Sequence, residues 1–176
     1  MDKRWLIIIL ILIIGCGTLY LIVDNSNVVG KASVNLKDST FTLPLGFDVF
    51  NSRQINDIEI VNYKTNMKIQ IIELENNNSA KADFNNSLSD LYNGTEFKVI
   101  DSGVATIANI TCYVIQFKHN ENVSGNGSNN FTYIFFYKDN YTYNIRVWNF
   151  DYKTDQEFVS GNVSFIIDSL RINYKK

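Results

Sequence analysis

Hydrophobic and polar residues alternate along much of the chain after residue 39. The clearest case is Met67–Leu74, where Met67, Ile69 and Ile71 alternate with Lys68 and Gln70. A period of two residues is typical of a β-strand with one buried face. We therefore expect strands to dominate this part of the chain.

Short polar turns join several of the expected strands. Residues 64–66 separate a strand at 58–63 from the one at 67–74, and residues 138–140 are the turn of a hairpin spanning 131–148. Tight turns of this kind connect antiparallel neighbours. Both faces of the first strand of the 131–148 hairpin are apolar, so at least one face is expected under a helix.

Three further strands are expected between the two helices described below. They cover residues 97–100, 104–107 and 111–118, and the first two are separated by Asp101-Ser102-Gly103. The segment from His119 to Asn130 is polar and rich in Gly and Asn, which indicates a long loop.

Two segments have the helical period of 3.6 residues. The first is capped by Asn78 or Ser79, carries Phe84, Leu88, Leu91 and Tyr92 on one side and stops at Asn93-Gly94. The second follows the capping box Thr154–Glu157, and its apolar stripe is Val159, Val163, Ile166, Ile167 and Leu170. The predicted fold class is α+β: an antiparallel sheet with two packed helices.

An uncharged apolar run at residues 5–23 precedes this domain. At about 1.5 Å per residue it spans roughly 28 Å, close to the thickness of a bilayer core. Lys3 and Arg4 precede the run, so the positive-inside rule keeps residues 1–4 in the cytoplasm and the rest outside. We expect a single-pass protein of the cell membrane with an extracytoplasmic C-terminal domain.

Two alternatives to this anchor stay open. One is a cleaved signal peptide, which the length of the run and the polar residues after it disfavour. The other is lipidation at Cys16, because Ile13-Ile14-Gly15-Cys16 resembles a lipobox. In the transmembrane interpretation Cys16 is a small residue within the helix.

The remaining chain divides into a tether and one domain. Residues 24–38 are polar and mixed, with room for one short strand at 33–36, and residues 39–176 have the size of a single domain. Cys16 and Cys112 are expected in different environments, so no disulfide is predicted. The net charge of −2 gives no basic footprint for nucleic acid.

Residues that would require a particular chemistry are sparse. His119 is the only histidine, and its expected position at a strand end favours a solvated side chain over a catalytic one. Asp151, Asp155 and Glu157 lie close in sequence but lack the spacing of a calcium loop, so we expect no metal and no cofactor. A pair of acids brought together in space stays an alternative, for an enzyme acting on envelope glycans or peptides.

Arg146 and Trp148 are the candidate binding residues. They lie on the outward side of the last strand of the 131–148 hairpin, in a segment crowded with aromatic residues. Exposed aromatic residues beside arginine favour interfaces, and we expect a binding edge for a glycan, peptide or protein.

Asn-x-Ser/Thr triplets occur nine times, against roughly three expected from composition alone. The candidate glycosylation sites are Asn77, Asn85, Asn93, Asn122, Asn126, Asn130 and Asn140. Asn109 and Asn162 are weaker candidates, because one lies beside a strand and the other within a helix. An Asn-rich composition by itself is the alternative explanation.

The order of elements resembles that of the PsbP-like α+β superfamily over residues 39–172. The similar features are FTLPLGF at 41–47, the first helix, the FTYIFFYKDNYTYNI hairpin at 131–145 and the closing FIIDSLRI at 165–172. With its N-terminal anchor, the chain also resembles small surface proteins of methanogenic archaea. These resemblances imply an accessory or partner-binding domain and supply no catalytic residue. The predicted function is a membrane-anchored, non-catalytic domain that binds a protein or glycan of the envelope.

Overall fold

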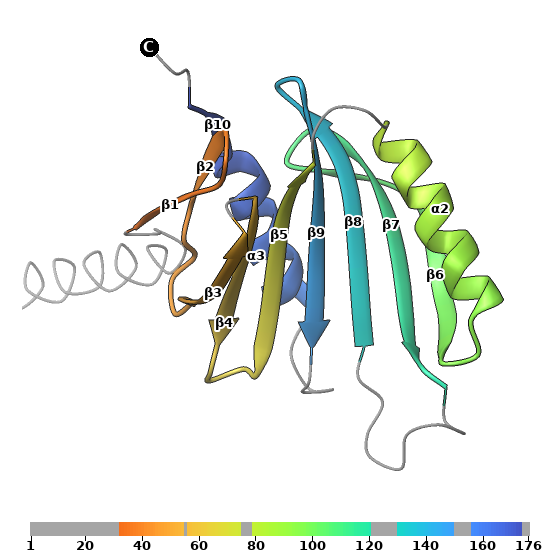
Figure 1. Ribbon diagram of the computed structural model, residues 1–176. Helices are drawn as coiled ribbons and strands as arrows, with labels where there is room; N and C mark the ends of the chain where they lie inside the picture. The colour runs from red at the N-terminus through yellow and green to blue at the C-terminus, as the bar shows by residue number, and fades with distance from the viewer. Residues whose placement is uncertain (1–31, 55, 75–78, 121–129, 150–155, 174–176) are drawn as a thin grey trace, which may run out of the picture.

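The computed structural model describes residues 32–54, 56–74, 79–120, 130–149 and 156–173. These ranges form two antiparallel sheets and two helices (Figure 1). A small sheet has the order β1-β2-β10, and a large sheet has the order β3-β4-β5-β9-β8-β7-β6. The α+β class with an antiparallel sheet and two helices is therefore confirmed.

The large sheet is built from seven strands, all antiparallel to their neighbours. Their bounds are β3 Asp48–Gln54, β4 Asp57–Asn62, β5 Met67–Leu74, β6 Phe97–Ile107, β7 Ile110–His119, β8 Asn130–Lys138 and β9 Tyr141–Asn149. The expected hairpins β4–β5 and β8–β9 are both present. Asp139 and Asn140 turn the second hairpin with positive φ angles of 51° and 70°, which asparagine and aspartate tolerate better than most residues.

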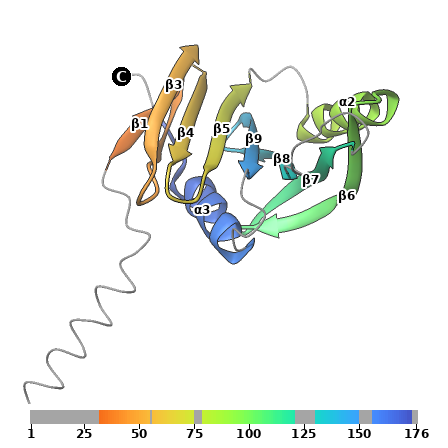
Figure 2. The same ribbon diagram turned by 90° about the horizontal axis from the view of Figure 1, so that it is seen from below.

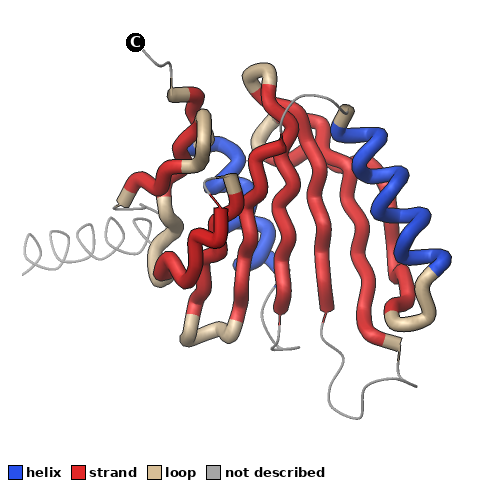
Figure 3. The backbone as a smooth tube through the Cα atoms, viewed as in Figure 1, coloured by secondary structure: helices blue, strands red, loops and turns tan. Residues whose placement is uncertain are grey.

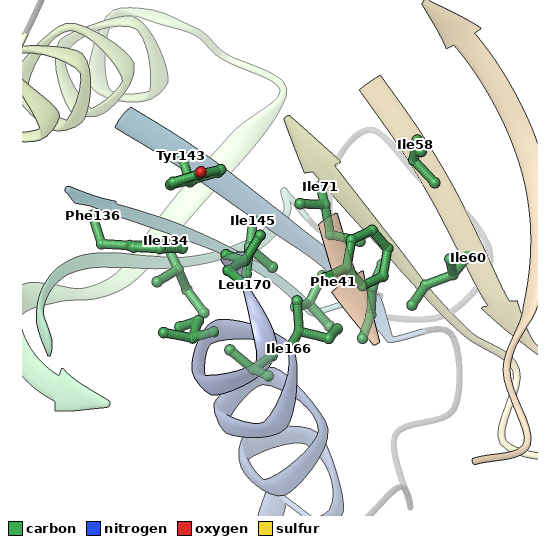
Figure 4. Packing of buried hydrophobic residues seen from close by; sticks show 14 of the residues in the cluster. Phe41, Ile58, Ile60, Ile71, Ile134, Phe136, Tyr143, Ile145, Ile166 and Leu170 are labelled. Atoms are coloured by element: carbon green, nitrogen blue, oxygen red, sulfur yellow. The ribbon is translucent and has the colours of Figure 1, made fainter. Parts of the chain in front are cut away.

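Helix α3, Gln156–Ser169, packs on one face of the large sheet. Its expected apolar stripe is confirmed: Val163, Ile166, Ile167 and Leu170 are buried and Val159 packs beside them. In Figure 4, Ile166 and Leu170 lie beside Ile145 of β9 and Phe41 of the small sheet. Residues 154 and 155 of the predicted capping box lie outside the described residues.

Helix α2, Ala80–Asn93, packs on the opposite face, over β6, β7 and β8 (Figure 2). The predicted cap is Ser79, whose Oγ accepts a hydrogen bond from the Ala82 N–H, and the predicted stop is Gly94, whose N–H donates to Asp90 O. Phe84, Leu88 and Leu91 face the sheet as expected. Since α2 and α3 cover opposite faces, β8 is apolar on both sides.

The small sheet joins the start of the described chain to its end. It contains β1 Ser33–Asn35, β2 Ser39–Thr42 and β10 Arg171–Ile172. The expected short strand after residue 32 is thus present, and Leu36 behind it is buried in the core. The packed domain therefore begins at Ser33, upstream of the start expected at Ser39.

Two local expectations are wrong. Residues 97–107 form one strand, visible in Figure 3, with a bulge between Val99 and Asp101 instead of a break at 101–103. β6 is an edge strand, so the polar residues at 101–103 can remain within the strand without being buried. Tyr92 is 66% exposed and does not join the apolar side of α2.

The membrane anchor lies outside the described residues, as does Cys16. Neither helix of the part that the structure describes has the length and apolar character to span a bilayer.

Candidate binding face

One area of the large sheet is polar, on the same face as α2. β4, β5 and β9 alternate buried apolar side chains toward α3 with polar side chains on the opposite side. Helix α2 packs on β6–β8, and no described helix covers this neighbouring area (Figure 2). We call it the polar face; its residues are Asp57, Glu59, Lys68, Gln70, Asn144, Arg146 and Trp148.

Strand register brings these residues together from distant parts of the sequence. Gln70 on β5 pairs with Glu59 on β4 and with Arg146 on β9. Lys68 pairs with Trp148. Because paired strands lie about 4.8 Å apart, these side chains form two neighbouring rows across the three strands.

Two acidic residues of the polar face have polar partners. Gln70 Nε2 donates to both carboxylate oxygens of Asp57, at 2.7 and 2.9 Å. Lys68 Nζ forms an ion pair with Glu59 Oε1 at 2.9 Å. Glu59 is only 4% exposed, so this ion pair replaces part of the water that its carboxylate has lost.

The cations of the polar face also lie over aromatic rings. Arg146 Cζ is 4.9 Å from the ring centroid of Tyr133, its cross-strand partner on β8. Lys68 Nζ is 4.8 Å from the ring centroid of Trp148. These contacts hold Arg146 and Trp148 in defined positions on the sheet.

Three buried polar atoms of this face have no hydrogen-bond partner in the part of the chain that the structure describes: Glu59 Oε2, Asn144 Oδ1 and Arg146 Nε. Leaving a buried polar group unpaired costs about 1–3 kcal/mol, and most such groups are satisfied in native proteins. One acceptor on β4, and one acceptor and one donor on β9, are thus left without a partner among the described residues, with β5 between the two strands.

A pocket of about 400 Å³ adjoins the polar face beneath the C-terminal half of α2. Arg146 and Tyr133 line its sheet side, Asp90 of α2 and Glu96 supply carboxylates, and Phe97 supplies an apolar wall. The volume falls within the range of small-molecule and side-chain pockets. Arg146 thus contributes to both the polar face and the pocket.

The structure places the predicted pair Arg146 and Trp148 side by side, but not at an edge. β9 is the central strand of the seven. Both side chains are half-buried and belong to the face of the sheet. Their binding role stays a prediction.

The candidate glycosylation sites differ in accessibility. Asn85 and Asn93 are exposed on α2, and Asn109 and Asn140 are exposed in two-residue turns; Asn130 is half-buried at the start of β8. Asn162 is buried within α3. Asn77, Asn122 and Asn126 lie outside the described residues.

His119, Cys112 and the acidic residues considered as metal ligands show no arrangement that supports catalysis or metal binding among the described residues. The His119 ring lies 4.7 Å from the Phe97 ring and 5.1 Å from the Phe131 ring, so it packs against aromatic residues instead of standing in solvent. Burial raises the pKa of the Cys112 thiol to about 11, which keeps it protonated and unreactive. Within the described ranges, no three His, Cys, Asp or Glu residues gather as a metal site, whereas Asp151 and Asp155 fall outside those ranges.

Sequence reasoning missed most of the polar face. Lys68 and Gln70 were expected on a solvent-facing side, and Glu59, Asn144 and Tyr133 were not singled out. The available signal was a buried-type strand, β4, that carries Glu59 between Ile58 and Ile60 and Asp57 just before Ile58. Charged residues at such positions usually have partners on the neighbouring strand.

The chain is similar in fold to several solved structures, although no family model and no curated protein matches its sequence. The Saccharomyces cerevisiae Ran-binding protein Mog1p aligns with a TM-score of 0.54 and 13% identity, over 80% of this chain and 94% of Mog1p. The cyanobacterial PsbP (CyanoP) from Synechocystis aligns with a TM-score of 0.51 and 11% identity, over 82% and 95%. LpqN of Mycobacterium tuberculosis, described as involved in cell envelope biogenesis, has a TM-score of 0.50 and 11% identity, over 81% and 90%.

These likenesses confirm the predicted PsbP-like fold over about four fifths of the chain. At such low identity they show the fold alone. The resemblance to archaeal surface proteins stays a prediction.

Proposed function

We propose that this chain is a membrane-anchored, non-catalytic domain that binds a protein partner outside the cytoplasm through its polar face. The observation that carries the proposal is the position of Arg146. It stacks over Tyr133, lines the adjoining pocket and keeps a buried Nε without a hydrogen-bond partner among the described residues.

The chemistry of the polar face suits a protein partner. Arginine, tryptophan and tyrosine are the residue types most enriched among those that dominate binding energy in protein interfaces. Asp57 and Glu59 lie on β4, whereas Lys68 and Arg146 lie on β5 and β9, so the face offers both signs of charge. Mixed charge of this kind supports specific pairing with a protein surface and disfavours a polyanion.

The membrane anchor and the location of the domain outside the cytoplasm are inferred from the sequence alone. The uncharged run at 5–23 follows Lys3 and Arg4, which favours a cytoplasmic N-terminus. The fold likeness to the Ran-binding Mog1p and to LpqN, which is described as involved in cell envelope biogenesis, adds support for an accessory binding domain, by analogy only.

The acids of the polar face favour binding over catalysis. Asp57 bonds to the amide of Gln70, and Glu59 bonds to the ammonium of Lys68. Both carboxylates are thereby engaged in holding neighbouring strands together.

Copurification from native membranes in mild detergent tests the binding role. The full chain, tagged after Lys176, is compared with the Arg146→Glu variant and with Tyr92→Ala, a matched control at an exposed position on α2. A partner retained by the wild type and by Tyr92→Ala but lost with Arg146→Glu supports the proposal. A partner retained equally by all three, with unchanged unfolding transitions, rejects the polar face as its site.

Protease accessibility tests the orientation. A protease added outside intact cells is expected to remove the tag after Lys176, and the Cys16→Ser variant is expected to stay in the membrane fraction. A tag cleaved only after lysis would reverse the orientation. Release of Cys16→Ser from membranes would favour the lipid anchor instead.

A further inference from the structure

Four large apolar side chains are exposed together at the β3 end of the large sheet. Leu45 is 41% exposed, Val49 49%, Phe50 58% and Tyr63 68%. They belong to the turn before β3, to β3 itself and to the residue after β4. We call this group the apolar rim.

The members of the apolar rim form two pairs: Val49 and Phe50 follow one another on β3, with the Phe50 ring 6.0 Å from Lys68 Nζ, and Leu45 and Tyr63 lie beside the start of β3 and the end of β4. Gly46 lies against Asn62, since a Cβ at Gly46 would be 3.3 Å from Asn62 Nδ2, and Leu45 and Tyr63 are the residues that flank this contact in the sequence. β3 pairs with β4 on one side only and is the last strand of the sheet among the described residues. Val49 and Phe50 therefore stand on an edge to which no further described strand is added.

The described chain begins beside this rim. Ala32 O accepts a hydrogen bond from the Leu43 N–H at 2.8 Å, two residues before Leu45. β1 and β3 accordingly lie at the same side of the molecule in Figures 1 and 2. Only residues 24–31 separate Ala32 from the apolar run at 5–23, and a stretch of that length reaches at most roughly 28 Å.

We propose that the apolar rim rests on the lipid surface of the membrane that holds the anchor. The inference builds on the anchor of the proposed function and adds a second point of membrane contact. Phe50 and Tyr63 are aromatic, and Lys64 next to Tyr63 is exposed. Aromatic and lysine side chains are the usual residues at the boundary between lipid and water.

This arrangement explains why the four side chains gather where the chain enters the domain. A short tether keeps this side of the domain near the headgroups, where exposed apolar area leaves water. The opposite end of the sheet, at β6 and α2, points away from the bilayer. The domain is then held in one orientation instead of swinging on its tether.

Fluorescence quenching in vesicles tests the proposal with the full chain. An environment-sensitive thiol label is placed at Tyr63→Cys in a Cys16→Ser background, and the same label at Tyr92→Cys is the matched control on α2. Cys112 is buried and contributes no label, which the unsubstituted Cys16→Ser chain verifies. The vesicles contain phosphatidylcholine and phosphatidylglycerol, with or without nitroxide-labelled lipid.

The expected result is blue-shifted emission at position 63 and loss of that emission with nitroxide lipid, while position 92 is unaffected. Adding Leu45→Ser to the labelled chain is expected to weaken the quenching at position 63. A chain that floats with the vesicles but shows no quenching at position 63 overturns the inference and leaves the anchor intact. If two copies of the Tyr63→Cys variant cross-link to each other and show no quenching, the rim is a self-association surface and the inference is overturned. If the chain does not float with the vesicles, both the anchor and the lipid contact of the rim are overturned.

Discussion

Ser39 Oγ donates a hydrogen bond of 2.5 Å to Glu73 Oε2, joining the small sheet to the large one. The Asp38 N–H donates to the other carboxylate oxygen at 3.0 Å, and Glu73 is only 2% exposed. A buried carboxylate needs such donors because it has lost its water. The turn between β1 and β2 is thus fixed to β5 by one side chain.

Replacing Ser39 with alanine is expected to lower the free energy of unfolding by about 1–3 kcal/mol, because Glu73 Oε2 loses its donor. Urea unfolding followed by tryptophan fluorescence measures the effect. Ser33→Ala, at an exposed position of β1, is the control and should be nearly neutral. Equal stability of Ser39→Ala and wild type would show that the bond is not needed.

Lys68→Met is expected to destabilise the domain by up to about 3 kcal/mol, because it leaves the charge of Glu59 buried without its ion-pair partner. The double variant Glu59→Gln with Lys68→Met removes both charges and should recover most of the loss. A double-mutant cycle compares the unfolding free energies of the wild type, Glu59→Gln, Lys68→Met and the double variant. Additive losses would contradict the coupling.

Stability is expected to fall at high pH. Burial raises the pKa of Cys112 from 9.0 to about 11 and the pKa of Tyr143 from 10.0 to about 12. A group whose pKa is higher in the folded state stabilises that state fully below its unfolded pKa, so the contribution is lost as pH rises from about 9 to 12. Urea midpoints across this range measure the decline, and Cys112→Ala should flatten its lower part.

In a host that glycosylates asparagine, occupancy is expected at Asn85, Asn93 and Asn109 and not at Asn162. The first three are exposed, whereas Asn162 is 6% exposed within α3 and has no room for a glycan. Peptide mass spectrometry of the native protein reads each site separately. A glycan on Asn162 would mean that α3 is accessible to the transferase before it packs.

Local periodicity was sufficient to predict most elements, because their amphipathic faces pack on a sheet that lies beside them. Met67, Ile69 and Ile71 are completely buried as their alternation predicts, and the stripe of α3 follows its 3.6-residue period. The break expected at 101–103 failed because an edge strand tolerates a polar bulge that a central strand would not.

The polar face was not predictable by the same reasoning. Lys68 and Trp148 meet only because β5 pairs with β9, and this pairing joins segments that are far apart in the chain. Alternation assigns Lys68 to the side opposite the core but does not reveal which strand lies next to it. Arg146 and Trp148 were identified from their residue types, whereas their neighbours depend on topology.

The strand order 3-4-5-9-8-7-6 also has a consequence for the time course of folding. β3–β5 and β6–β9 can each form from neighbouring hairpins, but the sheet closes only when residues 67–74 meet residues 141–149. During synthesis β3, β4 and β5 therefore wait, with the edge of β5 unpaired, until β9 has emerged near the end of the chain. α3, which covers this junction and follows β9 in the chain, is the last helix to emerge and packs across the two halves.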